Sequence, residues 1–519
     1  MTRPTEGLIP ALVAGQAART PAAVAAVDEA GSLTYAELDL RANRLAHLLR
    51  ANGVRAESTV GVCLHRGVNL VVALLAVWRA GGAYLPLDPT HPGRRITSVL
   101  HAAGVGLVLT QTITDAPMAA AGVRTVVLDR ELTVADGFPA TEPASAAVTG
   151  DQAAYVLHTS GSTGTPKGVV VHHAGIANRV GWTVRAHGVG PGDRVLQKTA
   201  PTFDAAGWEI FAPLAGGATV VLAPTGAERD PALLMRLLAD RDITVLQVLP
   251  SLLRSLVDEP GWAQCGSLRL LFSAGEQLYA ELVHRFLDLL PRPDAVRVWN
   301  TYGPTECAID VTAHRFDPAQ RSGPVPIGRP IDGLRVVVVD ERGEPVPPGG
   351  RGELLAGGVG VGRGYLGRPE LTGEWFVPDP AGAPGARLYR TGDLVRRRMD
   401  GTLEYLGRRD DQVKVDGVRI EPGEVAAVLA AHPALRGVVV LGYPTAAGTR
   451  LAAYVCTADG SVPPGLREFL ALRLPETHLP DAFLGLRSFP TTAAGKVDRA
   501  ALPVPYQAVP ATRERAGVG

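Results

Sequence analysis

The sequence predicts an α/β protein with a large N-terminal domain built on parallel sheets and a smaller C-terminal domain. Its 519 residues exceed what one hydrophobic core usually supports, so at least two subdomains are expected. Short β-branched runs alternate with helical patterns through most of the chain, which is typical of βαβ units around parallel sheets. Near residue 330 the pattern changes to short strands separated by Gly, Pro and Asp turns, which indicates a small β-rich subdomain.

One βαβ unit is especially clear. Residues 218–223 (ATVVLA) and 243–249 (ITVLQVL) are predicted strands. Between them, leucines recur at the spacing of one helix face: Leu233, Leu234, Leu237 and Leu238. Earlier in the chain, Thr34 and Glu37 precede a helical pattern with the spacing of a capping box, so a helix is expected to begin there.

The N-terminal domain is expected over residues 1–409, with its β-rich subdomain over about 325–409. The strands of this subdomain are predicted at 334–339, 352–356 and 402–406. These strands are short and are separated by Gly, Pro and Asp turns, which suits a small β-rich subdomain.

A polar and charged stretch with glycines at both ends, GRRDDQVKVDG at 407–417, predicts a hinge. The residues after it have their own helix and strand patterns, so a small C-terminal domain is expected over 410–503. The tail over 504–519 is rich in Pro, Ala and Arg and is expected to be disordered.

The composition excludes several classes of partner and location. Lys plus Arg and Asp plus Glu both number 51, so electrostatics favour neither nucleic acid nor an anionic membrane as a partner. The four cysteines form no CxxC pair, which argues against a zinc site or a disulfide framework and suits a reduced cytoplasm. No apolar run approaches the roughly 20 residues of a membrane span, and the N-terminus does not resemble a secretion signal, so a cytoplasmic protein is expected.

The strongest functional signal is HTSGSTGTPKG at 158–168, which follows an apolar run. Glycines, hydroxyls and a lysine after a predicted strand form a loop whose N–H and O–H groups suit a polyphosphate. Its GxxGxxKG spacing differs from that of a Walker P-loop. A solvated Gly/Ser linker is the simpler alternative, but it would not account for Pro166, Lys167 and Gly168 at the end of the loop.

This loop resembles the phosphate loop of the adenylate-forming superfamily, which includes acyl-CoA synthetases, luciferases and nonribosomal peptide synthetase adenylation domains. Further motifs follow in the order of the adenylation domains: LTYAEL (33–38), RAGGAYLPLDP (79–89), FDAAGWEIF (203–211), NTYGPTE (300–306), GELLAGGVGVGRGYL (352–366), YRTGDL (389–394), GRRDDQVKVDGVRIEPGEV (407–425), LPETHLP (474–480) and GKVDR (495–499). The resemblance implies the adenylate-forming enzyme fold, with two βαβ-type sheet subdomains, the β-rich subdomain and a mobile α+β C-terminal domain. The first two motifs are expected to be structural, as a helix start and as a helix end before a buried strand.

The resemblance also implies ATP and Mg²⁺ as the nucleotide and its metal. The residues that correspond to the family's ATP site are Thr159, Ser160, Gly161, Ser162, Thr163, Gly164, Lys167, Asn300, Thr301, Tyr302, Gly303, Thr305, Asp393, Tyr405, Arg408 and Lys496. Asp393 would accept the ribose hydroxyls, Tyr302 and Tyr405 would lie against the adenine, and Asn300 would lie at the adenine edge. The residues assigned to catalysis are Lys496, Thr159, Thr305 and Glu306, with Glu306 as the metal ligand. Taken without the family, Asp393 would be a turn residue and Lys496 a solvated charge.

The substrate pocket implied by the resemblance is that for an α-amino acid, because Asp204 matches the residue that pairs with the α-ammonium. The pocket residues are Asp204, Ala205, Trp208, Gln247, Phe272, Ala274, Thr301, Ile309, Asp310 and Lys496. The set resembles the glutamine-activating pattern and differs from it mainly at Ala274 and Thr301. Gln247 can donate to and accept from a side-chain amide, and ionised Asp310 can accept from its NH₂ group. Glutamate, which Asp310 would repel, ranks second, and ornithine has little support from Gln247 and Phe272.

The expected reaction is attack of the amino-acid carboxylate on the α-phosphorus of ATP, followed by transfer of the acyl group to a carrier-protein phosphopantetheine thiol. The carboxylate is already ionised, so positioning and cations are needed and a general base is not. The resemblance implies rotation of the C-terminal domain about Asp410 between the two steps. A carrier is expected to act in trans, and the need for an MbtH-like partner is left open.

Three residues depart from the family pattern, and two alternative functions compete with amino-acid activation. His158, Ala206 and Asp416 stand where tyrosine, serine and arginine are frequent, and the charge reversal at Asp416 bears on carrier docking. An acyl-CoA or aryl-CoA ligase of the same superfamily is one alternative, which Asp204 and GKVDR disfavour. A non-catalytic, carrier-docking nucleotide-binding domain is the other. Retention of four functional residues disfavours it: Lys496, Asp393, Glu306 and Lys167.

Overall fold

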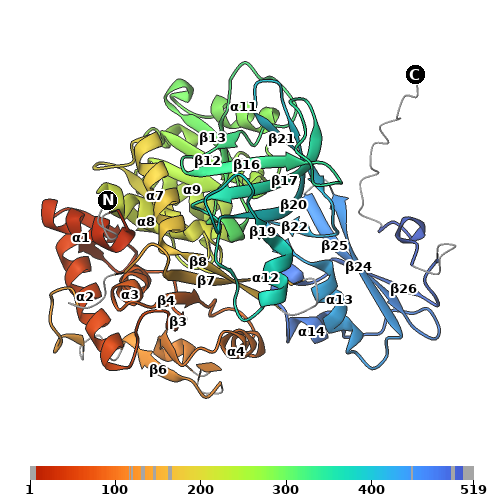
Figure 1. Ribbon diagram of the computed structural model, residues 1–519, viewed down its shortest axis with the longest axis horizontal. Coiled ribbons are helices and arrows are strands. Elements are labelled where there is room, and N and C mark those ends of the chain that lie inside the picture. Colours follow the sequence, from red (N-terminus) through yellow and green to blue (C-terminus); the bar gives the residue numbers. More distant parts are fainter. Residues whose placement is uncertain are drawn as a thin grey trace. The chain divides into compact units, whose positions relative to one another are not determined.

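The computed structural model describes residues 7–115, 117–118, 121–129, 135–143, 148–161, 166–445, 448–491 and 497–505 (Figure 1). It divides into two compact units by contact. The first comprises Met1–His158 and Gly168–Arg409, and the second comprises Thr159–Lys167 and Asp410–Gly519. The glycine-rich segment therefore groups with the second unit, although the sequence places it in the N-terminal domain. Most of the tail, from 506, lies outside the described residues.

In its described residues, the first unit contains three sheets, here named sheets 1, 2 and 3. Sheet 1 has the order β15 (Arg329–Pro330), β14 (Thr312–Arg315), β13 (Arg297–Tyr302), β12 (Leu270–Ala274), β11 (Val245–Val248), β9 (Arg194–Gln197), β10 (Thr219–Leu222), β1 (Val24–Val27), β2 (Ser32–Thr34). Sheet 2 has the order β18 (Gly364–Tyr365), β8 (Lys167–His172), β7 (Ala153–Thr159), β4 (Ala83–Pro86), β3 (Thr59–Val62), β5 (Leu107–Thr110), β6 (Arg124–Val127). Sheet 3 is antiparallel and consists of β16 (Leu334–Val339), β17 (Arg351–Gly358), β20 (Arg387–Arg397), β19 (Phe376–Pro378) and β21 (Leu403–Arg408).

Helices connect the parallel strands of sheets 1 and 2. Those described in the first unit are α1 (Ile9–Arg19), α2 (Tyr35–Ala51), α3 (Val68–Arg79), α4 (Gly93–Ala102), α7 (His173–His187), α8 (Ala205–Gly216), α9 (Pro231–Asp240), α10 (Pro250–Leu256), α11 (Ala280–Asp288) and α12 (Pro369–Trp375). The predicted βαβ unit is β10–α9–β11, and the predicted β-rich strands are β16, β17 and β21. The α/β prediction with parallel sheets and a β-rich subdomain is confirmed.

The strand order of sheet 1 reverses at β9. The chain runs from β9 to its parallel neighbour β10 and then crosses back to β11, which pairs with the other side of β9. In open parallel sheets, ligands bind beyond the carboxyl ends of the strands at such a reversal. Most of the predicted pocket residues lie on β11, β12 and β13 or in the segments that follow β9 and β13.

Local sequence signals explain where the first helices begin and end. Thr34 Oγ1 accepts the N–H of Glu37, and a Glu37 carboxylate oxygen accepts the N–H of Thr34, so the predicted capping box starts α2. The RAGGAYLPLDP motif is also structural, as predicted. Helix α3 ends at Arg79, and all of β4 that follows is buried.

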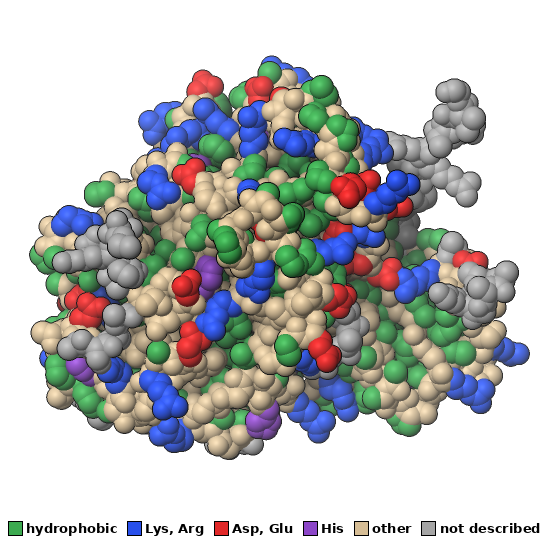
Figure 2. Space-filling model, viewed as in Figure 1, with side chains coloured by type: hydrophobic (Ala, Val, Ile, Leu, Met, Phe, Trp, Pro, Cys, Tyr) green, Lys and Arg blue, Asp and Glu red, His purple; other side chains and the backbone are tan. Residues whose placement is uncertain are grey.

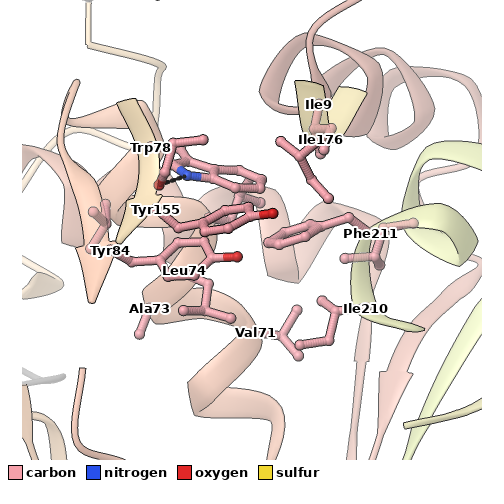
Figure 3. Packing of buried hydrophobic residues seen from close by; sticks show 14 of the residues in the cluster. Ile9, Val71, Ala73, Leu74, Trp78, Tyr84, Tyr155, Ile176, Ile210 and Phe211 are labelled. Carbon is pink, nitrogen blue, oxygen red and sulfur yellow. Dashed lines mark hydrogen bonds between the residues drawn. The ribbon is translucent and has the colours of Figure 1, made fainter. Parts of the chain in front are cut away.

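The main core lies between sheets 1 and 2 and is filled from both sheets and from α2, α3, α7 and α8 (Figure 1). Trp78 of α3 lies at its centre, with ring centroids 4.2 Å from Phe211 and 5.3 Å from Tyr84 (Figure 3). Its indole N–H donates to the Ala154 carbonyl at 2.7 Å, so the polar atom of this buried ring is satisfied. On the face shown in Figure 2, acidic and basic side chains lie intermingled, in keeping with the balanced charge.

The second unit contains a hairpin and a separate three-stranded sheet among its described residues. The hairpin is β22 (Val413–Val415) and β23 (Val418–Ile420), and the sheet is β24 (Gly437–Thr445), β25 (Gly448–Cys456) and β26 (Ala482–Leu486). Helices α13 (Pro422–Ala430) and α14 (Leu466–Ala471) pack with these strands around one apolar core. Over the described ranges of both units, no helix has the length and apolar content to cross a membrane.

Two buried histidines of α7 lie in apolar surroundings. His173 and His187 are each 1% exposed, and neither ring nitrogen of either residue has a hydrogen-bond partner among the described residues. His187 packs edge-on against Trp299 and Phe272 at 4.7 and 4.9 Å. Burial lowers the pKa of both imidazoles from 6.5 to about 3, with nearby positive charge adding to the effect at His187. Both side chains are therefore neutral in the folded protein at ordinary pH.

We predict that these histidines weaken the fold at acid pH. Their stabilising contribution is complete above the unfolded pKa of 6.5 and is lost as the pH falls towards about 3, by up to about 1.4 kcal/mol per pH unit for each group. The His187→Phe variant should lose less of its Tm between pH 7.5 and 5 than the wild type. The exposed His101→Phe is the control and should keep the wild-type dependence. An equal loss of Tm in His187→Phe and wild type would contradict the prediction.

Candidate functional site

Parallel strands bring the predicted pocket residues together at the carboxyl edge of sheet 1. Gln247 of β11 pairs with Phe272 of β12, and Ala274 of β12 pairs with Thr301 of β13. Paired residues in neighbouring strands face the same side of a sheet, and residues two apart in one strand share that side. Gln247, Phe272, Ala274 and Thr301 therefore share one face of the sheet, under helices α7 and α8.

The turn after β13 delivers the last pocket residues in an uncommon backbone conformation. Ala308 and Ile309 both have positive φ, at 56° and 82°, and Ile309 is β-branched, which makes this conformation unfavourable. A Cβ at Gly303 would lie 2.3 Å from the Ile309 carbonyl oxygen, so only glycine permits the turn to fold back on itself. The turn places Ile309 near α8, where its side chain lies 3.9 Å from a Cβ position on Gly207.

Asp310, the next residue, is held by a cation that the sequence did not indicate. Arg179 of α7 donates to Asp310 Oδ2 from Nε at 2.7 Å and lies within 2.6 Å of it through Nη2. The guanidinium also lies 5.1 Å from the Trp208 ring and 5.0 Å from the Trp182 ring. Arg179 belongs to no motif. Its only signal is its spacing from Ile176 and Val180, which puts it on the apolar face of α7, where a charge needs a partner.

Trp208 of α8 fixes the orientation of the Gln247 amide. The indole N–H donates to Gln247 Oε1, and an indole nitrogen cannot accept, so the amide oxygen must face Trp208. The Gln247 NH₂ group is thereby left for other contacts. Trp208 also packs edge-on against Phe272, with centroids 5.0 Å apart, so the amide, both rings and the Arg179–Asp310 pair are contiguous.

Two accessible polar atoms remain in this group. In the described part of the chain, neither Gln247 Nε2 nor Asp310 Oδ1 has a hydrogen-bond partner, and neither belongs to the fully buried atoms that lack one. This group of side chains therefore keeps one N–H donor and one carboxylate acceptor that its protein contacts do not use. The hydroxyl of Thr301 is fully buried and, among the described residues, has no partner either.

Asp204 precedes α8 at the mouth of this region. Although it occupies the N-cap position, its side chain makes no capping hydrogen bond to the helix, so capping does not explain this carboxylate. The negative charge of Asp204 acts on the buried phenols of Tyr84 and Tyr155. Burial raises the pKa of Tyr84 and of Tyr155, and the nearby Asp204 charge raises both further. Ala205 follows it as the first residue of α8.

The predicted ribose carboxylate lies between sheets 1 and 3. Asp393 of β20 accepts from Arg408 Nη1 at 2.7 Å through Oδ1, and from the Tyr302 hydroxyl through Oδ2. Asp393 and Arg408 are directly opposite each other in the β20–β21 ladder, which sets their approach. Each carboxylate oxygen keeps a second lone pair, so the protein bonds do not exhaust its acceptor capacity. The Tyr405 ring lies 6.4 Å from that of Tyr302.

Two other predicted nucleotide residues have protein partners. Asn300 donates from Nδ2 to the carbonyls of Val325 and Pro326, at 3.1 and 2.8 Å, so it also anchors this backbone. Glu306 is fully buried in the short 3₁₀ turn Thr305–Cys307, and its Oε1 accepts the Tyr365 hydroxyl at 2.8 Å. Within the described ranges, no group of three or more His, Cys, Asp or Glu residues could hold a metal.

The glycine-rich segment is described only in part. Ser162, Thr163 and Gly164, as well as Lys496, lie outside the described residues. Ser160 donates to the Arg419 carbonyl at 2.7 Å and accepts the Glu421 N–H at 3.2 Å, which explains why the segment groups with the second unit. The remaining predicted residues are placed as follows: Thr159 has a buried Oγ1 without a partner among the described residues, Gly161 follows Ser160, and Lys167 is buried at the start of β8.

The departure at Asp416 has a local structural reason. Asp416 and Gly417 form the two-residue connection between β22 and β23, with φ of 48° and 75°. Both residues therefore have positive φ, as in the tight hairpin turns that favour Asp-Gly. Asp416 also accepts from Arg450 Nη1 at 2.7 Å. The boundary between the two units falls six residues earlier, between Arg409 and Asp410.

Comparison with known proteins connects this site to a family. The model of the AMP-binding enzyme family matches residues 13–366. Phosphinothricin tripeptide synthetase PhsB of Streptomyces viridochromogenes is 44% identical over 99% of this chain, which covers 44% of that protein. Tyrocidine synthase 3 of Brevibacillus parabrevis is 42% identical over 96% of this chain, which covers 8% of that protein. The chain thus spans less than half the length of these two relatives.

Solved structures give the same result at the level of the fold. NpsA-ThdA, an artificially fused adenylation–PCP di-domain from Klebsiella oxytoca, has a TM-score of 0.81 and 28% identity, over 92% of this chain and 93% of that one. Holo-PA1221, an NRPS protein containing adenylation and PCP domains, also has a TM-score of 0.81, with 29% identity over 95% and 83% of the two chains. The chain therefore belongs to the AMP-binding enzyme family and is an ATP-dependent, AMP-forming ligase with the fold of an adenylation domain.

Proposed function

We propose that this chain activates L-glutamine, and L-glutamate as the second choice, as the aminoacyl adenylate, and then loads the acyl group onto a carrier thiol. In the first step an oxygen of the amino-acid carboxylate bonds to the α-phosphorus and pyrophosphate leaves. In the second step the thiolate sulfur bonds to the acyl carbon and AMP leaves. Nonribosomal peptide synthetases among the relatives support an amino-acid substrate.

The observation that carries the glutamine proposal is the paired donor and acceptor in the pocket. Trp208 donates to Gln247 Oε1, and Arg179 donates to Asp310 Oδ2. The other polar atom of each side chain, Gln247 Nε2 and Asp310 Oδ1, is therefore left for a ligand. A primary carboxamide has one acceptor oxygen and one NH₂ donor, so its hydrogen-bonding groups complement those of these two atoms. An unpaired buried polar atom costs about 1–3 kcal/mol, which is enough to discriminate against side chains that satisfy only one of them.

Other side chains satisfy this arrangement less well. A glutamate side chain could accept from Gln247, but its second oxygen would face the lone pairs of Asp310 Oδ1. An ammonium group, as in ornithine, would face the N–H groups of Gln247. The α-ammonium of each substrate would pair with Asp204, whose carboxylate is not used to cap α8.

The nucleotide assignments are supported by the chemistry of the groups around Asp393. Its remaining lone pairs suit ribose hydroxyls, and the Tyr302 and Tyr405 rings beside it suit a base. The partnerless hydroxyls of Thr159 and Thr301 fit polar atoms of a ligand. Mg²⁺ usually takes one or two carboxylates together with phosphate oxygens and water, so Glu306 as a single protein ligand fits, and the ion would neutralise charge on the triphosphate.

A carrier protein acting in trans is proposed as the second substrate. Both solved relatives contain an adenylation part and a PCP part, which supports this kind of partner. Asp410 is proposed as the hinge, since the compact units divide beside it, and Lys496 as the cation of the first step.

Amino-acid-dependent ATP–pyrophosphate exchange tests the substrate. With all common amino acids and ornithine at equal concentration, glutamine should give the fastest exchange and glutamate the next. Each unsatisfied pocket atom predicts a loss of roughly tenfold relative to glutamine. A ranking of glutamine below several unrelated amino acids would remove the glutamine proposal, and absence of exchange with every amino acid would remove amino-acid activation.

The Gln247→Glu variant tests the donor role of Gln247. It replaces the NH₂ group by an acceptor of nearly the same shape, so kcat/KM for glutamine should fall by about tenfold or more. Gln247→Met is the matched control for shape, because it removes both polar atoms without adding a charge. The interpretation predicts that Gln247→Glu loses more glutamine activity than Gln247→Met, and the reverse order would contradict it.

The Asp393→Asn variant tests the ribose assignment. It removes one acceptor and the charge that pairs with Arg408, so kcat/KM for ATP should fall by about 10- to 100-fold. The KM for the amino acid should change much less. Tyr302→Phe is the control, because it removes one neutral donor to Asp393 and should have a smaller effect on ATP. If Asp393→Asn had an unchanged KM for ATP, Asp393 would not bind the nucleotide.

The Asp410→Pro variant tests the hinge. Proline fixes φ near −65° and removes the N–H, which restricts the backbone rotation that a hinge requires. Exchange should remain measurable, whereas loading of a phosphopantetheine carrier, followed by mass spectrometry, should be abolished. Equal loss of both activities would show that Asp410 supports the fold or the first step and is not a hinge.

A further inference from the structure

The Arg179 guanidinium is enclosed by the structure and committed to protein partners. Arg179 is 1% exposed, and its Nε and Nη2 both approach Asp310 Oδ2, at 2.7 and 2.6 Å. Its Nη1 donates to Thr183 Oγ1, and Thr183 in turn donates to the Arg179 carbonyl at 3.0 Å. Trp182 and Trp208 lie against the guanidinium. Arg179 is therefore placed to act on a substrate through Asp310 and not by direct contact.

The ion pair determines both the charge and the geometry of the acceptor in the pocket. Asp310 is 3% exposed, and a carboxylate so buried would attract any cation that could enter. The guanidinium beside it cancels this charge, so the end of the pocket has no net charge. Because Arg179 engages Oδ2 only, Oδ1 stays available as the one acceptor.

We infer that Arg179 is a specificity-determining positioning residue, which neutralises Asp310 and orients it so that the pocket accepts a neutral carboxamide and rejects diamino acids. This inference rests on the proposed function, because it concerns the same pocket. Arg179 lies outside the predicted pocket set. According to the inference, it determines the choice among three side chains of similar length, which end in the amide of glutamine, the carboxylate of glutamate and the ammonium of ornithine.

Removing either charge of the pair alone should change the charge of the pocket, in opposite directions for the two residues. In Arg179→Met an unbranched apolar side chain replaces the arginine and the carboxylate of Asp310 is left without its counter-ion, so the pocket becomes negative. In Asp310→Asn the guanidinium is left without its counter-ion, so the pocket becomes positive. In the double variant Arg179→Met/Asp310→Asn the pocket is again neutral.

The experiment measures exchange with glutamine, glutamate and ornithine for wild type and all variants. The ratio between two amino acids is compared within one protein sample, so a partly unfolded preparation does not change it. In Arg179→Met, the ornithine-to-glutamine ratio of kcat/KM should rise at least tenfold. In Asp310→Asn, the glutamate-to-glutamine ratio should rise at least tenfold. The double variant should return both ratios towards the wild-type values.

Several outcomes would overturn the inference. An equal loss of exchange with all three amino acids in Arg179→Met would overturn it, because that is the result expected of a residue that only supports the fold. If Arg179→Met does not fold, Arg179→Lys and Asp310→Asn carry the test: the lysine variant keeps the charge and should still reject ornithine, and the asparagine variant should favour glutamate. Acceptance of ornithine by the lysine variant, or an unchanged ratio in Asp310→Asn, contradicts the inference.

The same measurements separate this inference from the proposed function. The wild-type ranking alone decides whether glutamine is the substrate. The opposite shifts in the two single variants decide whether the Arg179–Asp310 pair sets the selection by charge, whichever of the three amino acids ranks first in the wild type.

Discussion

The buried contact between Arg179 and Asp310 is the interaction on which the arrangement of the proposed substrate pocket depends. It joins helix α7 to the turn after β13, and the same guanidinium packs against Trp208 of α8. Loss of one partner from a buried ion pair costs about 3–5 kcal/mol, because the other charge is left in a medium of low dielectric. The left-handed residues Ala308 and Ile309 lie directly before Asp310, and such conformations cost about 1–3 kcal/mol each. The ion pair helps to hold this turn in its unfavourable conformation.

The topology of sheet 1 explains why polar groups meet at this place. Strand order reverses at β9, and the chain leaves β9, β11, β12 and β13 at one edge, so residues far apart in sequence become neighbours. These strands are largely apolar and buried, and Gln247 and Thr301 lie near the carboxyl ends of β11 and β13. The rings of Trp208 and Phe272 pack against each other beside Gln247, whose amide oxygen accepts from the Trp208 indole.

Much of the fold was predictable because its signals are local. The β10–α9–β11 unit, the start of α2 at Thr34 and the strands of sheet 3 each follow from spacing within a few residues. The residues proposed for the pocket on β11, β12 and β13 were assigned from the family motifs, and strand pairing brings them to one face of sheet 1. Arg179 was not predictable, since its partner lies 131 positions away and no motif includes it. The bond from Tyr302 to Asp393 is likewise a long-range contact, which periodicity cannot reveal.

The close approach of the backbone at Gly303 has a consequence for redesign of such enzymes. Residues 309–311 occupy the space where a side chain at position 303 would stand, so the turn and this glycine form one inseparable element. Transplanting only the pocket-lining side chains into another scaffold would move a buried anion without its guanidinium and without the glycine that shapes its loop. A functional graft would have to include Gly303, the whole turn to Asp310, and Arg179 from a helix that carries none of the predicted pocket residues.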